Sequence, residues 1–230
     1  MFVRTLPLDK DSSVTDRTSE FFDRYAGGFN AIYGNANGPF ESIVNRLFRQ
    51  AMVKRYEKTL AGCQPMEGRT VIDVGCGPGH YGVALASAGA AHVLGLDFAP
   101  GMLTLAEQAA KARRVAERCT FVLGDFLTYP IPERFDYVIV MGFMDYVRDP
   151  GPVIDRVLEI MKSRAFFSFP KAGGPLAWQR QLRYRNRCDL FLYSEAQIRK
   201  LFEATGAPFT IESLGRDFFV TIEPAKSRAS

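Results

Sequence analysis

The stretch VIDVGCGPGHYG, residues 71–82, decides the fold of this chain. It runs from an apolar, β-branched segment into three glycines at alternate positions, and an Ala- and Leu-rich segment follows. Glycines remove side chains where backbone must approach a ligand, and the N-terminus of a following helix offers free amides to polar or anionic atoms. The stretch therefore predicts a strand, a ligand-binding loop and a helix in succession.

Two other interpretations of this stretch stay open. Residues 77–82 match the dinucleotide-binding pattern G-x-G-x-x-G, and Asp97 lies at about the expected distance downstream. The same residues could form only a tight turn between a strand and a helix. The pattern D-x-G-x-G-x-G, which begins at Asp73, describes the stretch more completely.

Strand and helix signals alternate after this stretch. Apolar runs predict strands, and the runs between them have helical spacing. Ser194 and Gly206 are a suitable cap and stop for a helix, and a hairpin signal follows around residues 215–216. The expected strands are 69–74, 91–96, 119–125, 135–142, 164–170, 209–215 and 217–223. This order predicts an α/β fold with a mostly parallel sheet and helices on both faces.

Acidic residues follow the second and third predicted strands. Asp97 could accept hydrogen bonds from both hydroxyls of a ribose, and Asp125 from the exocyclic amine of an adenine. Phe98, Met102 and Phe126 could flank the adenine ring. Asp97 could instead only cap the next helix, and Gly-Asp-Phe is a common turn. Ligands bind at the carboxyl ends of parallel strands, so the order favours an adenosine site there.

Met141, Gly142 and Phe143 close the fourth predicted strand, and Asp145 and Tyr146 come soon after. This strand end faces the reacting centre in a sheet of this kind. The residues could instead cap the next helix or pack beneath it.

In this order, residues 69–222 resemble the class I S-adenosylmethionine-dependent methyltransferases. The resemblance implies a Rossmann-like sheet of seven strands with an antiparallel last strand, and S-adenosylmethionine as cofactor. It implies that the glycines contact the methionine part, Asp97 the ribose and Asp125 the adenine. The full set of expected cofactor-binding residues is Asp73, Gly75, Cys76, Gly77, Gly79, Asp97, Phe98, Met102, Asp125, Phe126 and Met141.

Residues 22–34, 55–60 and 164–171 also resemble the magnesium-protoporphyrin O-methyltransferase group. The chain departs from that group at Met141 and Asp145, where the group carries Asp and His, and across 172–188. The cofactor site is therefore carried over and the porphyrin substrate is not. Carboxyl O-methylation of that type stays as an alternative.

The departing segment is rich in arginine. Arg is well suited to planar recognition of carboxylates and phosphates. We expect residues 171–192 to form a cap over the acceptor, with Arg180 and Arg183 binding an anionic or aromatic group. The alternatives are a solvated basic helix face and a small contact with nucleic acid, which is not the partner we expect.

Methyl transfer is a direct displacement, which requires alignment and, for a hydroxyl acceptor, a general base. His80, Asp145 and Tyr33 are the candidate catalytic residues, and Tyr25, Phe143 and Tyr146 could bind the acceptor. The expected reaction is O-methylation of a small anionic, aromatic or glycan-type molecule. A nicotinamide-dependent oxidoreductase and a non-catalytic scaffold that binds the cofactor are the alternatives.

Composition fits one globular domain with an N-terminal extension. The 230 residues are 47% hydrophobic and 23% charged, which excludes disorder, and the net charge of +4 is too small to demand nucleic acid. The scattered cysteines and two histidines predict neither a metal site nor disulfides. No apolar run approaches the roughly 20 residues of a membrane span, and residues 1–16 lack a signal-like apolar stretch, so we expect a cytoplasmic protein. The expected organisation is a tail (1–18), a helical lid (19–62) and a methyltransferase domain (63–230).

Overall fold

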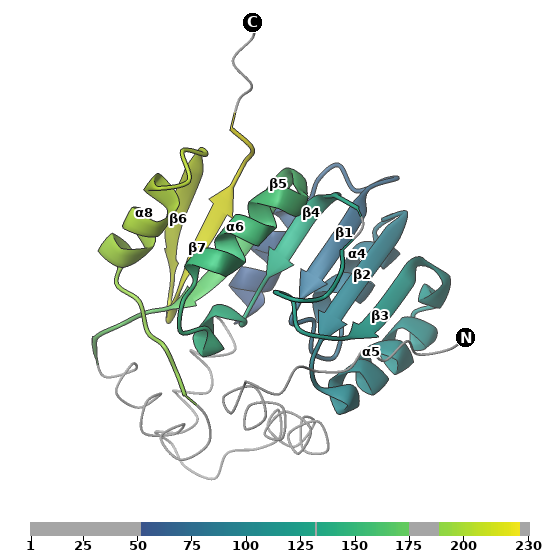
Figure 1. Ribbon diagram of the computed structural model, residues 1–230. Coiled ribbons are helices and arrows are strands. Elements are labelled where there is room, and N and C mark those ends of the chain that lie inside the picture. Colours follow the sequence, from purple (N-terminus) through teal and green to yellow (C-terminus); the bar gives the residue numbers. More distant parts are fainter. Residues whose placement is uncertain (1–51, 132, 175–188, 226–230) are drawn as a thin grey trace, which may run out of the picture.

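A seven-stranded sheet forms the centre of the computed structural model, which describes residues 52–131, 133–174 and 189–225. The strand order is β3-β2-β1-β4-β5-β7-β6 (Figure 1). Strands β1 to β5 run parallel, and β7 runs antiparallel to both β5 and β6. The strands are β1 (Thr70–Val74), β2 (His92–Asp97), β3 (Cys119–Leu123), β4 (Phe135–Val140), β5 (Met161–Pro170), β6 (Phe209–Leu214) and β7 (Asp217–Ile222). This confirms the predicted sheet with its antiparallel last strand.

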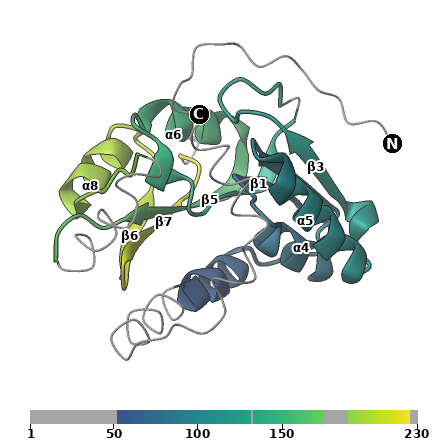
Figure 2. The ribbon, with the colours of Figure 1, turned by 90° about the horizontal axis from the view of Figure 1, so that it is seen from below.

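Helices cover both faces of the sheet, as predicted. Helices α4 (His80–Ser87) and α5 (Pro100–Ala112) lie on one face together with a helix over residues 52–62. Helices α6 (Gly151–Ile160) and α8 (Glu195–Glu203) lie on the other face (Figure 2). Two short 3-10 helices, η1 (Ala116–Arg118) and η2 (Met144–Tyr146), precede β3 and follow β4.

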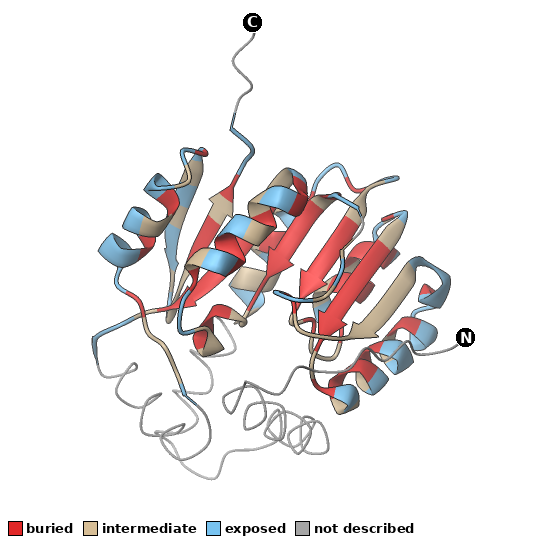
Figure 3. Ribbon diagram, in the orientation of Figure 1, coloured by how far each residue is buried: buried red, intermediate tan, exposed pale blue. Residues whose placement is uncertain are grey.

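The strands bury side chains on both faces, because alternate residues of a strand point to opposite sides. In β4, Val138 and Val140 join the core under α6 and α8, whereas Tyr137 and Ile139 join the core under α4. The central strands are therefore buried along their length, and exposure increases toward the edge strands β3 and β6 (Figure 3). Such near-continuous apolar strands are typical of a parallel sheet covered by helices.

The last helix begins and ends at the residues that the sequence indicated. Ser194 accepts a hydrogen bond from the Gln197 amide, and the Gln197 side chain accepts one from the Ser194 amide, which makes a capping box. Gly206 follows the helix with a φ of 67°. Strand β5 begins three residues before its predicted start, at Met161, directly after α6.

Parts of the predicted organisation lie outside the described residues: the tail (1–18), the lid up to residue 51, and residues 175–188 of the cap. Within the described part of the chain, no helix is long and apolar enough to cross a membrane.

Candidate cofactor and acceptor site

The predicted site residues that the structure describes lie along the edge of the sheet formed by the carboxyl ends of its parallel strands. The loop after β1 leads into α4, Asp97 ends β2, Asp125 follows β3, and η2 follows β4 (Figure 1). All of these positions are at the carboxyl ends of parallel strands, where open α/β sheets bind ligands. Tyr25, Tyr33, Arg180 and Arg183 lie outside the described residues.

The glycine loop is held in place by backbone contacts to β2. The amides of Gly75 and Cys76 both donate to the Leu96 carbonyl, at 2.8 and 3.0 Å. Gly75, Gly77 and Gly79 have φ values of 65°, 51° and 76°, in the region that side-chain-bearing residues seldom adopt. Apart from Gly77 and its two neighbours in the chain, no described residue has an atom within 4 Å of the position that a Cβ on Gly77 would take. The loop therefore leaves open space beside its backbone at Gly77.

Asp97 joins this loop to the start of the next helix. Its Oδ2 accepts a hydrogen bond from the Gly77 amide at 2.8 Å, and its Oδ1 accepts one from the Ala99 amide at 2.9 Å. A carboxylate offers about four acceptor positions, so holding these two amides is compatible with a ribose-binding role. Asp97 therefore holds both the glycine loop and the residue before α5, and its ribose role stays a prediction.

Asp73 lies beneath the loop. Its side chain is 2% exposed, and Oδ2 accepts a hydrogen bond from the Gly82 amide at 3.2 Å. Burial raises the pKa of Asp73 to about 7, against the Gly82 bond, and the nearby Asp97 charge adds to the rise. Cys76 is also buried, and burial raises the pKa of its thiol well above the ordinary range. Both side chains contact protein and support the loop from below.

The predicted adenine-flanking residues differ in exposure. Met102 and Phe126 are each 2% exposed, so protein atoms surround both side chains. Phe126 meets the Phe143 ring edge-on and lies under the Arg156 guanidinium, 5.5 Å from the ring centroid. Phe98 is half-buried and follows Asp97 directly in sequence. Met141, at the end of β4, is buried.

Asp125 lies in a turn that is held by a side chain from α6, a helix on the opposite face of the sheet from α4 and α5. Its Oδ1 accepts a hydrogen bond from the Leu127 amide at 2.7 Å. From α6, Arg156 donates to the carbonyls of Leu127 (3.0 Å) and Tyr129. The turn therefore holds a half-buried carboxylate next to the end of β3.

The end of β4 packs directly on the glycine loop. A Cβ on Gly75 would lie 2.7 Å from a ring carbon of Phe143, so Phe143 covers this glycine. Asp145, in η2, is 6% exposed, and its carbonyl accepts a hydrogen bond from the Phe191 amide at 2.9 Å. Tyr146 is half-buried. The structure thus brings three of the predicted acceptor-side residues to one strand end.

His80 begins α4 and is exposed at the helix N-terminus. Desolvation lowers its pKa below the ordinary 6.5. The imidazole is therefore mostly neutral at pH 7 and able to accept a proton.

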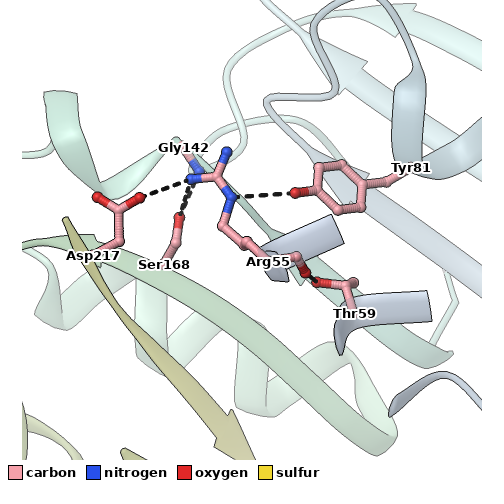
Figure 4. A network of polar contacts seen from close by, with 6 residues as sticks. All are labelled: Arg55, Thr59, Tyr81, Gly142, Ser168 and Asp217. Carbon is pink, nitrogen blue, oxygen red and sulfur yellow. Dashed lines mark hydrogen bonds and ion pairs between the residues drawn. The ribbon is translucent and has the colours of Figure 1, made fainter. Parts of the chain in front are cut away.

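Arg55 is a residue of this edge that the sequence reasoning missed (Figure 4). Its Nε donates to the Tyr81 hydroxyl (3.2 Å), and its Nη1 donates to the Ser168 hydroxyl (3.2 Å) and to Asp217 (3.5 Å). Arg55 lies four residues before the buried Thr59, whose hydroxyl donates a hydrogen bond to the Arg55 carbonyl. This helical spacing is the sequence signal that could have indicated that both residues lie on the same side of the helix.

Comparison with known proteins agrees with this geometry. A family model described as a methyltransferase domain matches residues 66–198, more than half of the chain. The chain is 31% identical over 142 residues to a demethylmenaquinone methyltransferase of Bacillus licheniformis, covering 60% of this chain and 58% of that protein. It is 32% identical over 109 residues to a ubiquinone biosynthesis O-methyltransferase of Pseudomonas fluorescens, covering 47% and 43%. The chain spans about half the length of the curated relatives it matches.

Among solved structures, the magnesium protoporphyrin IX methyltransferase of Synechocystis PCC 6803 with bound S-adenosylhomocysteine superposes with a TM-score of 0.72. The superposition covers 92% of this chain and all of that one at 21% identity, which shows a shared fold. The chain belongs to the methyltransferase domain family. The cofactor of this family is S-adenosylmethionine, and the glycine loop, with open space at Gly77 among the described residues, fits it.

Proposed function

We propose that this protein transfers a methyl group from S-adenosylmethionine to an oxygen atom of a small-molecule acceptor. The observation that carries the proposal is the glycine loop held by Asp97, open at Gly77 and located at the carboxyl ends of β1 and β2. The family match supports the same reaction class.

In this proposal, residues at different strand ends bind different parts of the cofactor. Backbone of residues 75–79 contacts the methionine part, Asp97 accepts from the ribose hydroxyls, and Asp125 accepts from the adenine amine. Phe98 packs on the adenosine. Asp73, Cys76, Met102, Phe126 and Met141 lie behind these groups and hold them in position.

The protein's contribution to the reaction is alignment, exclusion of water and removal of a proton. When bound, the cofactor supplies a methyl group on a sulfonium, which an acceptor oxygen attacks in line. Phe143 and Tyr146 border the acceptor. Two residues could take the proton of a hydroxyl: His80, which is neutral at pH 7, and the buried Asp145. An acceptor that is already ionised needs no base.

Of the names of two relatives, one supports an oxygen acceptor and the other does not state the acceptor atom. One is a ubiquinone biosynthesis O-methyltransferase and the other a demethylmenaquinone methyltransferase. We infer that phenols and aromatic acids are the first acceptors to examine.

The proposal is tested by turnover with a panel of acceptors. Purified protein is incubated with methyl-labelled S-adenosylmethionine and phenols, aromatic and porphyrin carboxylates, or sugars, and S-adenosylhomocysteine and methylated product are measured. We expect acceptor-dependent formation of both in equal amounts, lost in Asp97→Ala and kept in the exposed Asp155→Ala. Tight cofactor binding with no product from any acceptor class would instead favour the non-catalytic scaffold.

A further inference from the structure

The turn after β4 is held in place from two sides. The turn consists of residues 142–147 and carries the acceptor-side residues of the proposed function, which are Phe143, Asp145 and Tyr146. It begins at Gly142, with a φ of 74°, and the Tyr146 amide donates to the Phe143 carbonyl at 3.1 Å. The position of the acceptor-side residues therefore depends on what fixes the backbone of this turn.

From β5, Ser168 holds the start of the turn (Figure 4). The last residues that pair between β4 and β5 are Val140 and Phe167, and Ser168 comes directly after them. Its hydroxyl, on a side chain that is almost fully buried, accepts hydrogen bonds from the Gly142 amide at 2.8 Å and from Arg55 Nη1 at 3.2 Å. The hydroxyl therefore continues the contact between β4 and β5 beyond the point at which their backbones pair.

From the other side, the segment before α8 holds the end of the turn. The Phe191 amide donates to the Asp145 carbonyl at 2.9 Å, and the Tyr193 hydroxyl donates to the Val147 carbonyl at 2.8 Å. The backbone of Tyr193 is itself fixed, because its amide donates to the Pro170 carbonyl at 2.9 Å. Tyr193 therefore ties the turn after β4 to the carboxyl end of β5.

The surroundings of Tyr193 suit its hydroxyl to this contact. The residue is 7% exposed, and its ring meets the Phe169 ring edge-on, with 5.1 Å between the centroids. Burial, together with the charges of Asp145 and Asp149, raises the pKa of Tyr193 to about 12, so the hydroxyl remains a donor at neutral pH. Removal of the hydroxyl alone would leave the ring packing intact and take away the bond to the Val147 carbonyl.

We propose that Tyr193 and Ser168 are positioning residues, which hold the turn after β4 where the methyl acceptor binds. The inference rests on the proposed function, because the turn borders an acceptor only if the protein transfers a methyl group. Both residues act through the turn and not by contact with the reacting atoms. A turn displaced by about 1 Å would move the acceptor out of line with the methyl group, and such a displacement can slow a reaction about 100-fold.

Matched tyrosine variants of the whole chain test this role. Tyr193→Phe removes the hydroxyl that holds the turn. Tyr137→Phe is the control, because Tyr137 is 4% exposed and its hydroxyl likewise donates to a backbone carbonyl, that of Pro65, at 3.1 Å before β1. Ser168→Ala removes the hydroxyl on β5, and Ser168→Thr restores it. Kinetics are measured with 3,4-dihydroxybenzoate or with whichever member of the acceptor panel is methylated faster, and S-adenosylhomocysteine affinity is measured by calorimetry.

We expect Tyr193→Phe to lower kcat/KM for the acceptor at least about tenfold, with S-adenosylhomocysteine affinity within about twofold of wild type. Tyr137→Phe loses an equivalent hydrogen bond, so it should lower the melting temperature by a similar amount and keep wild-type kinetics. Ser168→Ala should lower kcat/KM in the same way, and Ser168→Thr should recover most of the loss. Amide hydrogen exchange across residues 142–147 should be faster in Tyr193→Phe and Ser168→Ala alone.

The inference is overturned if Tyr193→Phe and Ser168→Ala keep wild-type acceptor kinetics. It is also overturned if Tyr137→Phe lowers kcat/KM as much as Tyr193→Phe, or if S-adenosylhomocysteine affinity falls in parallel with kcat/KM, since the role is then structural or belongs to the cofactor site. A wild type that binds S-adenosylhomocysteine and methylates no acceptor contradicts the proposed function itself. Amide exchange still decides in that case whether the two side chains hold the turn, and equal exchange across residues 142–147 in every variant would show that they do not.

Discussion

Gly77 carries the clearest prediction at the scale of single residues. Its φ is 51°, and no described residue apart from its two chain neighbours has an atom within 4 Å of a Cβ placed on it. Gly77→Ala should therefore lower the free energy of unfolding only by the backbone strain of about 1 kcal/mol, while its methyl group occupies space in the proposed cofactor site. We expect S-adenosylhomocysteine binding, measured by calorimetry, to weaken at least about tenfold.

Gly68 provides the matched control. Its φ is 72°, no described residue apart from its two chain neighbours has an atom within 4 Å of its Cβ position, and it precedes the opposite end of β1. Gly68→Ala should lower the melting temperature as much as Gly77→Ala and leave binding unchanged. Equal binding by the two variants would show that the space beside Gly77 is not a ligand site.

Asp73 should make stability depend on pH. Its folded pKa of about 7 exceeds its ordinary 3.8, so the folded state binds more protons between these values, and stability falls as pH rises from 4 to 8. The full difference between the two pKa values corresponds to about 4 kcal/mol of unfolding free energy. Asp73→Asn keeps an acceptor for the Gly82 amide and removes the titration.

Thermal melting between pH 4.5 and 8 checks this prediction. Asp73→Asn should be more stable than wild type at pH 8, with the difference shrinking toward pH 4.5. A difference that is constant across this range would mean that Asp73 has an ordinary pKa in the folded protein.

Single residues were predicted from sequence where a local pattern determines them. Asp97 ends its strand as expected. Arg55 was missed because its partners Tyr81, Ser168 and Asp217 are 26, 113 and 162 residues away in sequence. The core packing of Phe126 likewise depends on Arg156, which belongs to another element.

At the scale of elements, α6 fixes the turn after β3 through Arg156. Its guanidinium donates to the Leu127 and Tyr129 carbonyls and covers the Phe126 ring. Arg156→Met should leave those carbonyls without their partner and loosen the turn that presents Asp125. We expect a loss of about 1–3 kcal/mol in unfolding free energy and roughly threefold to tenfold weaker binding of 5′-methylthioadenosine.

Arg199→Met is the control for this variant. Arg199 forms an exposed pair with Glu195 on α8, and such a pair contributes only about 0.5 kcal/mol. Stability and binding should both stay close to wild type. If Arg156→Met behaves like Arg199→Met, α6 does not support the adenine end of the site.

Element types followed from sequence more reliably than element ends. The hairpin signal at residues 215–216 became the β6–β7 turn, and Ser194 caps α8 as predicted. The bounds of α6 were not predicted, although Val153, Ile154 and Val157 repeat at helical spacing on its buried face. The start of β5 was placed late because polar side chains follow Met161.

At the scale of the whole molecule, the strand order could not be worked out from the residues alone. Neighbours such as β1 and β4 are far apart in sequence. The hydrophobic pattern of a buried strand does not reveal which position it takes in the sheet. The resemblance to methyltransferases supplied the seven-stranded sheet with its antiparallel last strand, which the structure confirms, whereas the strand order was not predicted. The acceptor could not be identified in this way, because fold leaves the substrate open.

The central claim is that this sheet edge binds S-adenosylmethionine, and calorimetric titration of the whole chain tests it most directly. Wild type, Asp97→Ala and Asp155→Ala are each titrated with S-adenosylmethionine, S-adenosylhomocysteine and NADH. We predict binding of both adenosyl ligands in the micromolar range by wild type and Asp155→Ala, loss of that binding in Asp97→Ala, and no binding of NADH. A folded wild type that binds NADH, or that binds neither adenosyl ligand, would contradict the account.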